Sequence, residues 1–130
     1  MCGYVSIAPQ RLMRLKINKN ERNKLLKEMA MADVLANHGF KVHLVEEDPR
    51  RGSFDALING VPADFKRTKS HNNIRKYASK AFRKQQAKIL VFQFDRDTPS
   101  IHWEITYLLQ NKYPVIYFFS DRKDDVYVHL

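Results

Sequence analysis

Apolar and polar residues follow each other along this chain in patterns that separate helices from strands. Apolar positions at helical spacing, bounded by capping residues and by proline, predict three helices, which run from Asn18 to just before Gly39, from Asn72 or Asn73 to about Ala87, and from Thr98 through Leu109. Alternating or continuous apolar runs predict strands in FKVHLVEE, FDALI, VPADFKRT and KILVFQF, with VIYFF and VYVHL closing the chain around the turn DRKDD. The order α-β-β-β-α-β-α-β predicts an α/β (α+β) fold, a mixed β-sheet flanked by helices, in which residues 63–94 form a right-handed parallel crossover.

The length of the chain and its apolar runs limit how the fold is organised. The 130 residues predict a single domain, in which residues 1–17 form an arm or a short strand. The longest apolar runs, ILVF and VIYFF, are far too short to span a bilayer, so we expect no membrane contact. The N-terminus lacks the pattern of a signal peptide, and a single cysteine excludes an internal disulfide framework. We therefore expect the protein to act in a cytoplasm.

The stretch FDALINGVPADFKRTKS places an aspartate on each side of an Asn-Gly turn. Because both residues of a tight hairpin loop need positive φ, Asn59-Gly60 is a strong hairpin signal. Counting outward from this loop pairs Asp55 with Asp64 at a non-hydrogen-bonded position, where the two Cα atoms should be about 4.5 Å apart. Like charges directly opposite each other destabilise a sheet. The register therefore predicts that one aspartate is protonated or that a cation lies between them.

The residues after the hairpin indicate a role for such a cation. Lys66 shares a strand face with Asp64, and carboxylate oxygens favour Mg²⁺ or Mn²⁺ over Zn²⁺. Nine basic residues and no acidic one lie between Lys66 and Lys88, in a chain whose net charge is +9. Lys and Arg hold the phosphates of nucleic acids, and a metal activates water against a phosphodiester. We expect the phosphate contacts to come from Arg67, Lys69, Arg75, Lys76, Lys80, Arg83 and Lys84.

Simpler interpretations of these residues are open at this point. Asp55 and Asp64 can form a solvated pair on an outer sheet face, neutralised by Lys66. The basic surface can be solvated and without a partner. Glu28, on the first predicted helix, can be an ordinary exposed glutamate.

Asp55 followed by Asp64-Phe65-Lys66 resembles the D…(D/E)-x-K signature of the PD-(D/E)XK nuclease superfamily, in a matching hairpin before a matching crossover helix. The resemblance covers roughly residues 20–119 and implies a restriction-endonuclease-like core. Within this superfamily the size, the layout and the Lys-Gln-Gln-Ala before the next strand are most similar to the nuclease toxin domains at the C-termini of contact-dependent growth inhibition (CdiA-type) proteins. Phe54 departs from the pattern, because a proline often precedes the first aspartate.

The resemblance also implies roles for single residues. Asp55 and Asp64 would be metal ligands, with Glu28 a ligand directly or through water, and Lys66 would position or activate the attacking water. It further implies an active-site glutamine, which is either Gln85, at an apolar position of the crossover helix, or Gln86, which matches the Gln-Ala pairing of the family better.

Taken together, the residues and the resemblance predict a metal-dependent endonuclease that hydrolyses phosphodiester bonds in DNA or RNA. An RNA-cleaving toxin, such as a tRNA nuclease on the same fold, is one alternative, and a basic nucleic-acid-binding module without catalysis is another. For a toxin domain the resemblance implies an acidic immunity partner and delivery into the cytoplasm of a target cell.

Overall fold

A computed structural model describes residues 3–14, 18–46 and 53–130 of the chain. Within these residues it contains seven strands and four helices. Their bounds, in chain order, are β1 Tyr4–Ile7, α1 Pro9–Arg14, α2 Lys19–Asn37, β2 Lys41–Leu44, β3 Ala56–Ile58, β4 Val61–Thr68, α3 Ile74–Arg83, β5 Ile89–Phe94, α4 Pro99–Gln110, β6 Val115–Phe119 and β7 Arg122–His129.

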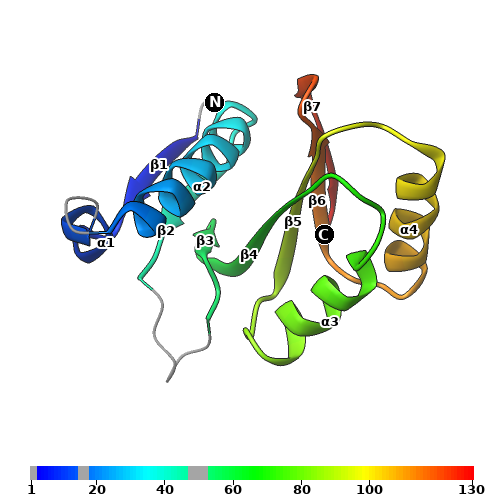
Figure 1. The fold of residues 1–130 in the computed structure, drawn as a ribbon, viewed down its shortest axis with the longest axis horizontal. Helices are drawn as coiled ribbons and strands as arrows, with labels where there is room; N and C mark the ends of the chain where they lie inside the picture. The colour runs from blue at the N-terminus through cyan, green and yellow to red at the C-terminus, as the bar shows by residue number, and fades with distance from the viewer. Residues whose placement is uncertain (1–2, 15–17, 47–52) are drawn as a thin grey trace.

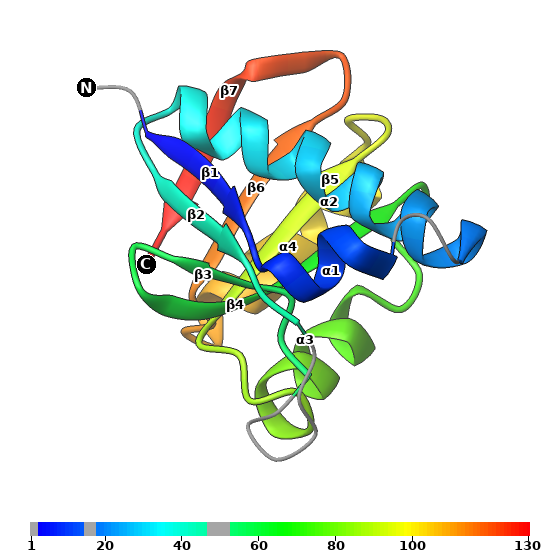
Figure 2. The ribbon, with the colours of Figure 1, turned by 90° about the vertical axis from the view of Figure 1, so that its left-hand side faces the viewer.

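The strands form one mixed sheet in which spatial order follows chain order from β1 to β7. β1 is parallel to β2, and β5 is parallel to both β4 and β6, whereas the remaining neighbours are antiparallel. The sheet curls into a half-barrel, and α2 covers one of its faces while α3 and α4 cover the other (Figures 1 and 2). The predicted α/β fold with a mixed sheet flanked by helices, and the parallel pairing of β4 with β5, are confirmed. None of the helices in the described ranges is long and apolar enough to cross a membrane.

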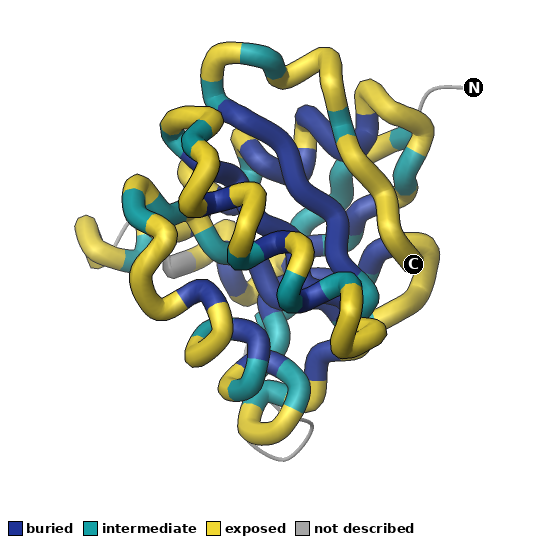
Figure 3. The backbone as a smooth tube through the Cα atoms, turned by 90° about the vertical axis from the view of Figure 1, so that its right-hand side faces the viewer, coloured by how far each residue is buried: buried dark blue, intermediate teal, exposed yellow. Residues whose placement is uncertain are grey.

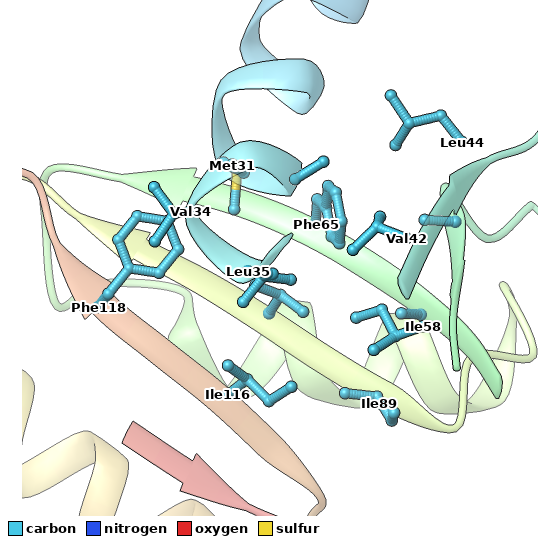
Figure 4. Close-up of a cluster of buried hydrophobic side chains, with 14 of the residues drawn as sticks. Met31, Val34, Leu35, Val42, Leu44, Ile58, Phe65, Ile89, Ile116 and Phe118 are labelled. Carbon is cyan, nitrogen blue, oxygen red and sulfur yellow. The ribbon is translucent and has the colours of Figure 1, made fainter. Parts of the chain in front are cut away.

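Strand β5 explains why the run KILVFQF has no polar alternation. All of its residues are buried, because the strand has helices on both sides. Ile89 and Val91 belong to the core under α2 together with Leu35 (Figure 4), and Leu90 and Phe92 belong to the core under α3 and α4. Seen from the side of α3 and α4, the buried strands run beneath helical turns whose outer surfaces are exposed (Figure 3).

The predicted helix boundaries are set by local capping. The side chain of Asn18 accepts hydrogen bonds from the N–H groups of Asn20 and Glu21 at the start of α2, and Thr98 accepts one from the N–H of Ile101 at the start of α4. Caps of this kind stabilise a helix by about 1 kcal/mol each. Gly39 has a φ of 102°, as expected for the residue that stops α2.

Three boundaries differ from the sequence-based expectation. The segment expected to be an arm or short strand contains β1 and also the short helix α1, which packs on α2. Helix α3 ends at Arg83 rather than near Ala87, because the N–H groups of Lys84 and Gln85 both bond to the carbonyl of Lys80 and close the helix. Strand β7 begins at Arg122, inside the expected turn DRKDD, because pairing with β6 extends the strand almost to the end of its neighbour.

Candidate active site

A difference in strand length opens a cleft beside β4. β3 pairs with β4 only at residues 61–63, so from Asp64 onward the edge of β4 that faces β3 is not covered by that strand. A cleft of ≈520 Å³ lies here, between α2 and the second half of β4. It is lined by Lys24, Lys27, Glu28, Met31, Asp55, Phe65, Lys66, Arg67, Lys69, Gln85 and Asp95.

The hairpin register predicted from Asn59-Gly60 is confirmed in its three ladder pairs, 58 with 61, 57 with 62, and 56 with 63. Both loop residues have positive φ, 50° and 84°. The next pair departs from the expectation, because Asp55 lies before β3 and outside the ladder. Its N–H donates to the carbonyl of Ala63 at 2.9 Å, and its Oδ2 accepts from the N–H of Phe65 at 2.9 Å. The Asp55 carboxylate thus satisfies a backbone donor on the uncovered edge of β4.

Asp64 is fully buried, with 0% of its surface exposed. No N–H or hydroxyl group of the described residues donates to either of its carboxylate oxygens, and only the adjacent carboxyl of Asp55, while it is protonated, can do so. Lys66 forms an ion pair with Asp64, in which Nζ lies 3.6 Å from Oδ2, beyond hydrogen-bonding distance, and near the ring of Tyr77. Because buried polar atoms are usually satisfied, these two oxygens call for a partner.

The two aspartates influence each other electrostatically. Burial, together with the hydrogen bond and the charge of the adjacent Asp64 carboxyl, raises the pKa of Asp55 to about 8, against the opposing effects of the Phe65 N–H and of Lys24. The buried charged form is disfavoured by desolvation and by a neighbouring like charge. Near neutral pH the pair therefore keeps a proton on Asp55 unless a cation replaces it.

Glu28 faces the same cleft from α2 and is buried, not exposed. Both of its carboxylate oxygens accept hydrogen bonds from Arg11 of α1, at 3.1 and 2.9 Å, and Arg11 also donates to the carbonyl of Val45. Burial raises the pKa of Glu28 and the charge of Asp55 adds to this effect, whereas Arg11 opposes it. Sequence reasoning missed Arg11, because nothing in RLMR indicates a partner 17 residues away.

The position of Glu28 bears on its expected role as a metal ligand. No group of three His, Cys, Asp or Glu side chains in the described part of the chain is arranged to hold a metal ion. The bidentate bond to Arg11 occupies the oxygens that Glu28 would offer to a metal, so a direct bond to a metal requires Arg11 to move. The geometry brings Glu28 to the cleft and favours an indirect role.

The two candidate glutamines differ in their position relative to the cleft. Gln85 lines the cleft, and its Oε1 is buried without a hydrogen-bond partner among the described residues. Gln86 is exposed, outside the cleft lining, with a φ of 58°. Because α3 ends at Arg83, Gln85 lies past the helix, and the position on its apolar stripe predicted from the sequence is wrong.

The expected phosphate contacts divide into three groups. Arg67 and Lys69 line the cleft, and Arg67 is paired with Asp95 at 3.2 Å. Arg75 points to α4, where it bonds to Glu104 at 2.6 Å and stacks on Tyr107 at 3.7 Å, so it joins the two helices. The other predicted contacts are exposed on or just after α3 and do not line the cleft; they are Lys76, Lys80, Arg83 and Lys84. Sequence reasoning missed the two lysines that α2 contributes, Lys24 and Lys27.

Known proteins resemble the chain at two levels. No curated protein matches it. Over 97% of its length it is similar to a solved structure described as "CdiA-CT/CdiI toxin and immunity complex from Burkholderia pseudomallei", with a TM-score of 0.64 and 23% identity over 98% of that chain. This likeness supports the fold.

Residues 51–117, which include Asp55, Asp64, Lys66 and Gln85, match the model of the contact-dependent growth inhibition CdiA C-terminal domain. Since the match spans half of the sequence, the chain belongs to the CdiA C-terminal domain family.

Proposed function

We propose that the protein is a metal-dependent nuclease of the PD-(D/E)XK type that acts as a growth-inhibition toxin. The observation that carries this proposal is Asp64, a fully buried carboxylate to which no N–H or hydroxyl group of the described residues donates. It adjoins Asp55 and Lys66, which line a cleft with a basic rim. A structural carboxylate would have a partner of its own. A buried carboxylate without one is typical of a site that binds a ligand.

The donor set fits a divalent cation that prefers oxygen. Asp55 and Asp64 would hold Mg²⁺ or Mn²⁺, whose ligands are carboxylates and water. Such a cation polarises a phosphoryl oxygen and lowers the pKa of bound water when present. The charges of these residues also suit a cation. It would compensate the two like charges, which otherwise keep a proton on Asp55.

The chain's own side chains would do the remaining work. Lys66, held between Asp64 and the ring of Tyr77, would orient the attacking water and balance the charge that develops on the phosphate. Lys24, Lys27 and Lys69 would hold the flanking phosphates along the cleft. Gln85 offers an unsatisfied amide oxygen inside the cleft, and we assign it, rather than Gln86, as the active-site glutamine.

The similar Burkholderia structure is a complex of a toxin with its immunity protein. We propose the same kind of partner for this chain, an acidic protein that covers the basic cleft. The charge of +9 supports this choice, because complementary charge speeds association and selects the partner. The toxin would act in the cytoplasm of the cell into which it is delivered.

The direct test is to incubate the protein with plasmid DNA and with total RNA, each in Mg²⁺, Mn²⁺ or EDTA. We expect cleavage of one substrate, abolished by EDTA and by Asp64→Asn while binding persists. Asp125→Asn on the exposed strand β7 is the matched control and should cleave normally. Cleavage in EDTA, or by the Asp64 variant, would refute the mechanism. Binding without cleavage under all metals would instead indicate a non-catalytic module.

A further inference from the structure

Trp103 is the single tryptophan of the chain, and it lies largely in solvent. Tryptophan is on average among the more buried residues, yet 72% of Trp103 is exposed on α4. The apolar stripe of α4 that enters the core is formed by Ile101, Ile105 and Leu108, so the fold does not require an indole at position 103. In the described part of the chain its ring has no aromatic or cationic partner. This side chain is therefore available to a ligand.

Trp103 borders a hollow on α4, a helix that contacts between side chains hold against α3. The ring lines a hollow of ≈350 Å³ together with His71, Pro99, Ser100 and Glu104. Glu104 is paired with Arg75, whose guanidinium stacks on Tyr107, one helical turn beyond Trp103. This pairing compensates the carboxylate and fixes α4 against α3, which lies beside it (Figure 1).

One short loop joins this hollow to the cleft of the proposed active site. Lys69 lines the cleft and His71 lines the hollow, in the connection between β4 and α3. Two residues span at most about 7 Å of chain, which is about two nucleotide rises of a nucleic-acid strand. A strand held at Lys69 can therefore enter the hollow past His71 within a few nucleotides.

We propose that the hollow beside Trp103 is a nucleobase subsite, in which an unpaired base of the substrate stacks on the indole. The inference rests on the proposed nuclease function and narrows its substrate to nucleic acid that is single-stranded, looped or frayed next to the cleaved bond. A base within a duplex is already stacked and paired, so it does not offer a free face to the indole. Stacking on an exposed aromatic ring is the way in which proteins bind single strands without reading their sequence.

The single tryptophan makes the test direct. In the Asp64→Asn variant, which should bind without cleaving, short single-stranded DNA and RNA oligonucleotides are titrated while indole fluorescence is followed. Binding is measured in parallel by the anisotropy of a labelled oligonucleotide. We expect saturable quenching by the oligonucleotide type that binds. An abasic oligonucleotide of equal length, which keeps the phosphates, should bind more weakly and leave the fluorescence nearly unchanged.

Substitutions complete the experiment. Trp103→Ala should weaken oligonucleotide binding about 5- to 150-fold, the loss expected for one stacked base, and Trp103→Phe should restore most of it. Tyr4→Ala removes an aromatic ring that is 57% exposed on the distant strand β1 and should change nothing. Oligonucleotides that bind without quenching, an abasic strand that quenches equally, or an unchanged affinity in Trp103→Ala would each overturn the subsite and leave the nuclease proposal standing. If no single-stranded oligonucleotide binds at all, the subsite is likewise overturned, and cleavage of plasmid DNA or total RNA decides the nuclease proposal separately.

Discussion

Replacing Asp64 by Asn should stabilise the metal-free protein while it abolishes cleavage. The substitution keeps the shape of the side chain and removes a fully buried carboxylate whose oxygens lack hydrogen bonds within the described structure. A buried polar group without a partner costs about 1–3 kcal/mol, and the amide of Asn, unlike the carboxylate, carries N–H donors that can bond to the adjacent carboxylate of Asp55. With an unfolding entropy of about 2.1 cal/mol/K per residue, this gain corresponds to a rise in Tm of about 4–11 °C for a chain of this size.

The reasoning also predicts in which direction the stability of the metal-free protein changes with pH. Burial and the carboxyl of Asp64 raise the pKa of Asp55 from 3.8 to about 8, so the folded protein holds a proton that the unfolded chain has lost. Stability from this group is complete below pH 3.8 and falls as pH rises toward 8, by up to about 1.4 kcal/mol per unit. Because Asp64→Asn removes one cause of the raised pKa, its stability should fall less steeply with pH.

The assay is urea unfolding in EDTA at several pH values between 5 and 9, for the wild type, Asp64→Asn and the surface control Asp125→Asn. Added Mn²⁺ should then stabilise the wild type, by about 2.7 kcal/mol at a hundred times its Kd, and leave Asp64→Asn unchanged. A metal-free Asp64→Asn protein that is less stable than the wild type would mean that Asp64 has a structural partner, and the reasoning from its unpaired oxygens would be refuted.

Three further predictions concern other parts of the fold. Arg11→Met should lower the unfolding free energy, measured in urea, by about 3–5 kcal/mol, because it leaves Glu28 buried without its partner. Adding Glu28→Gln should recover much of this loss. An unchanged stability of Arg11→Met would show that the pair is not formed. Arg75→Ala should lower Tm and leave the salt slope of nucleic-acid binding unchanged, because Arg75 is assigned to the helix interface and not to a phosphate. Lys80→Ala should leave Tm unchanged and lower this salt slope by about 1, and the reverse pattern would contradict the assignment of Arg75. Gly60→Ala should destabilise the hairpin by about 1 kcal/mol through its φ of 84° alone, since open space surrounds the position, and a neutral result in thermal unfolding would exclude backbone strain there.

Several features of the protein follow from short stretches of sequence. Asn59-Gly60 specifies a tight hairpin because few other residues adopt positive φ at both positions, and this places Asp64 near Asp55. Asn18 and Thr98 begin their helices through bonds to N–H groups two or three residues away. The unbroken apolar run of β5 predicts that helices cover both of its faces. The hairpin and the helix caps depend on residues close together in the chain. The apolar run of β5 depends only on burial of both of its faces, whichever elements cover them.

The tertiary structure alone decided which distant groups share the cleft. Arg11 reaches Glu28 because β1 pairs with β2 and carries α1 onto α2, a contact that no local pattern encodes. Gln85 rather than Gln86 faces the cleft because α3 closes earlier than its composition indicates. The position of Trp103, one loop away from the cleft of the proposed active site, likewise depends on how α4 packs beside α3. Sequence patterns record backbone preference and burial, whereas these juxtapositions depend on the curl of a whole sheet and on packing between residues far apart in the chain.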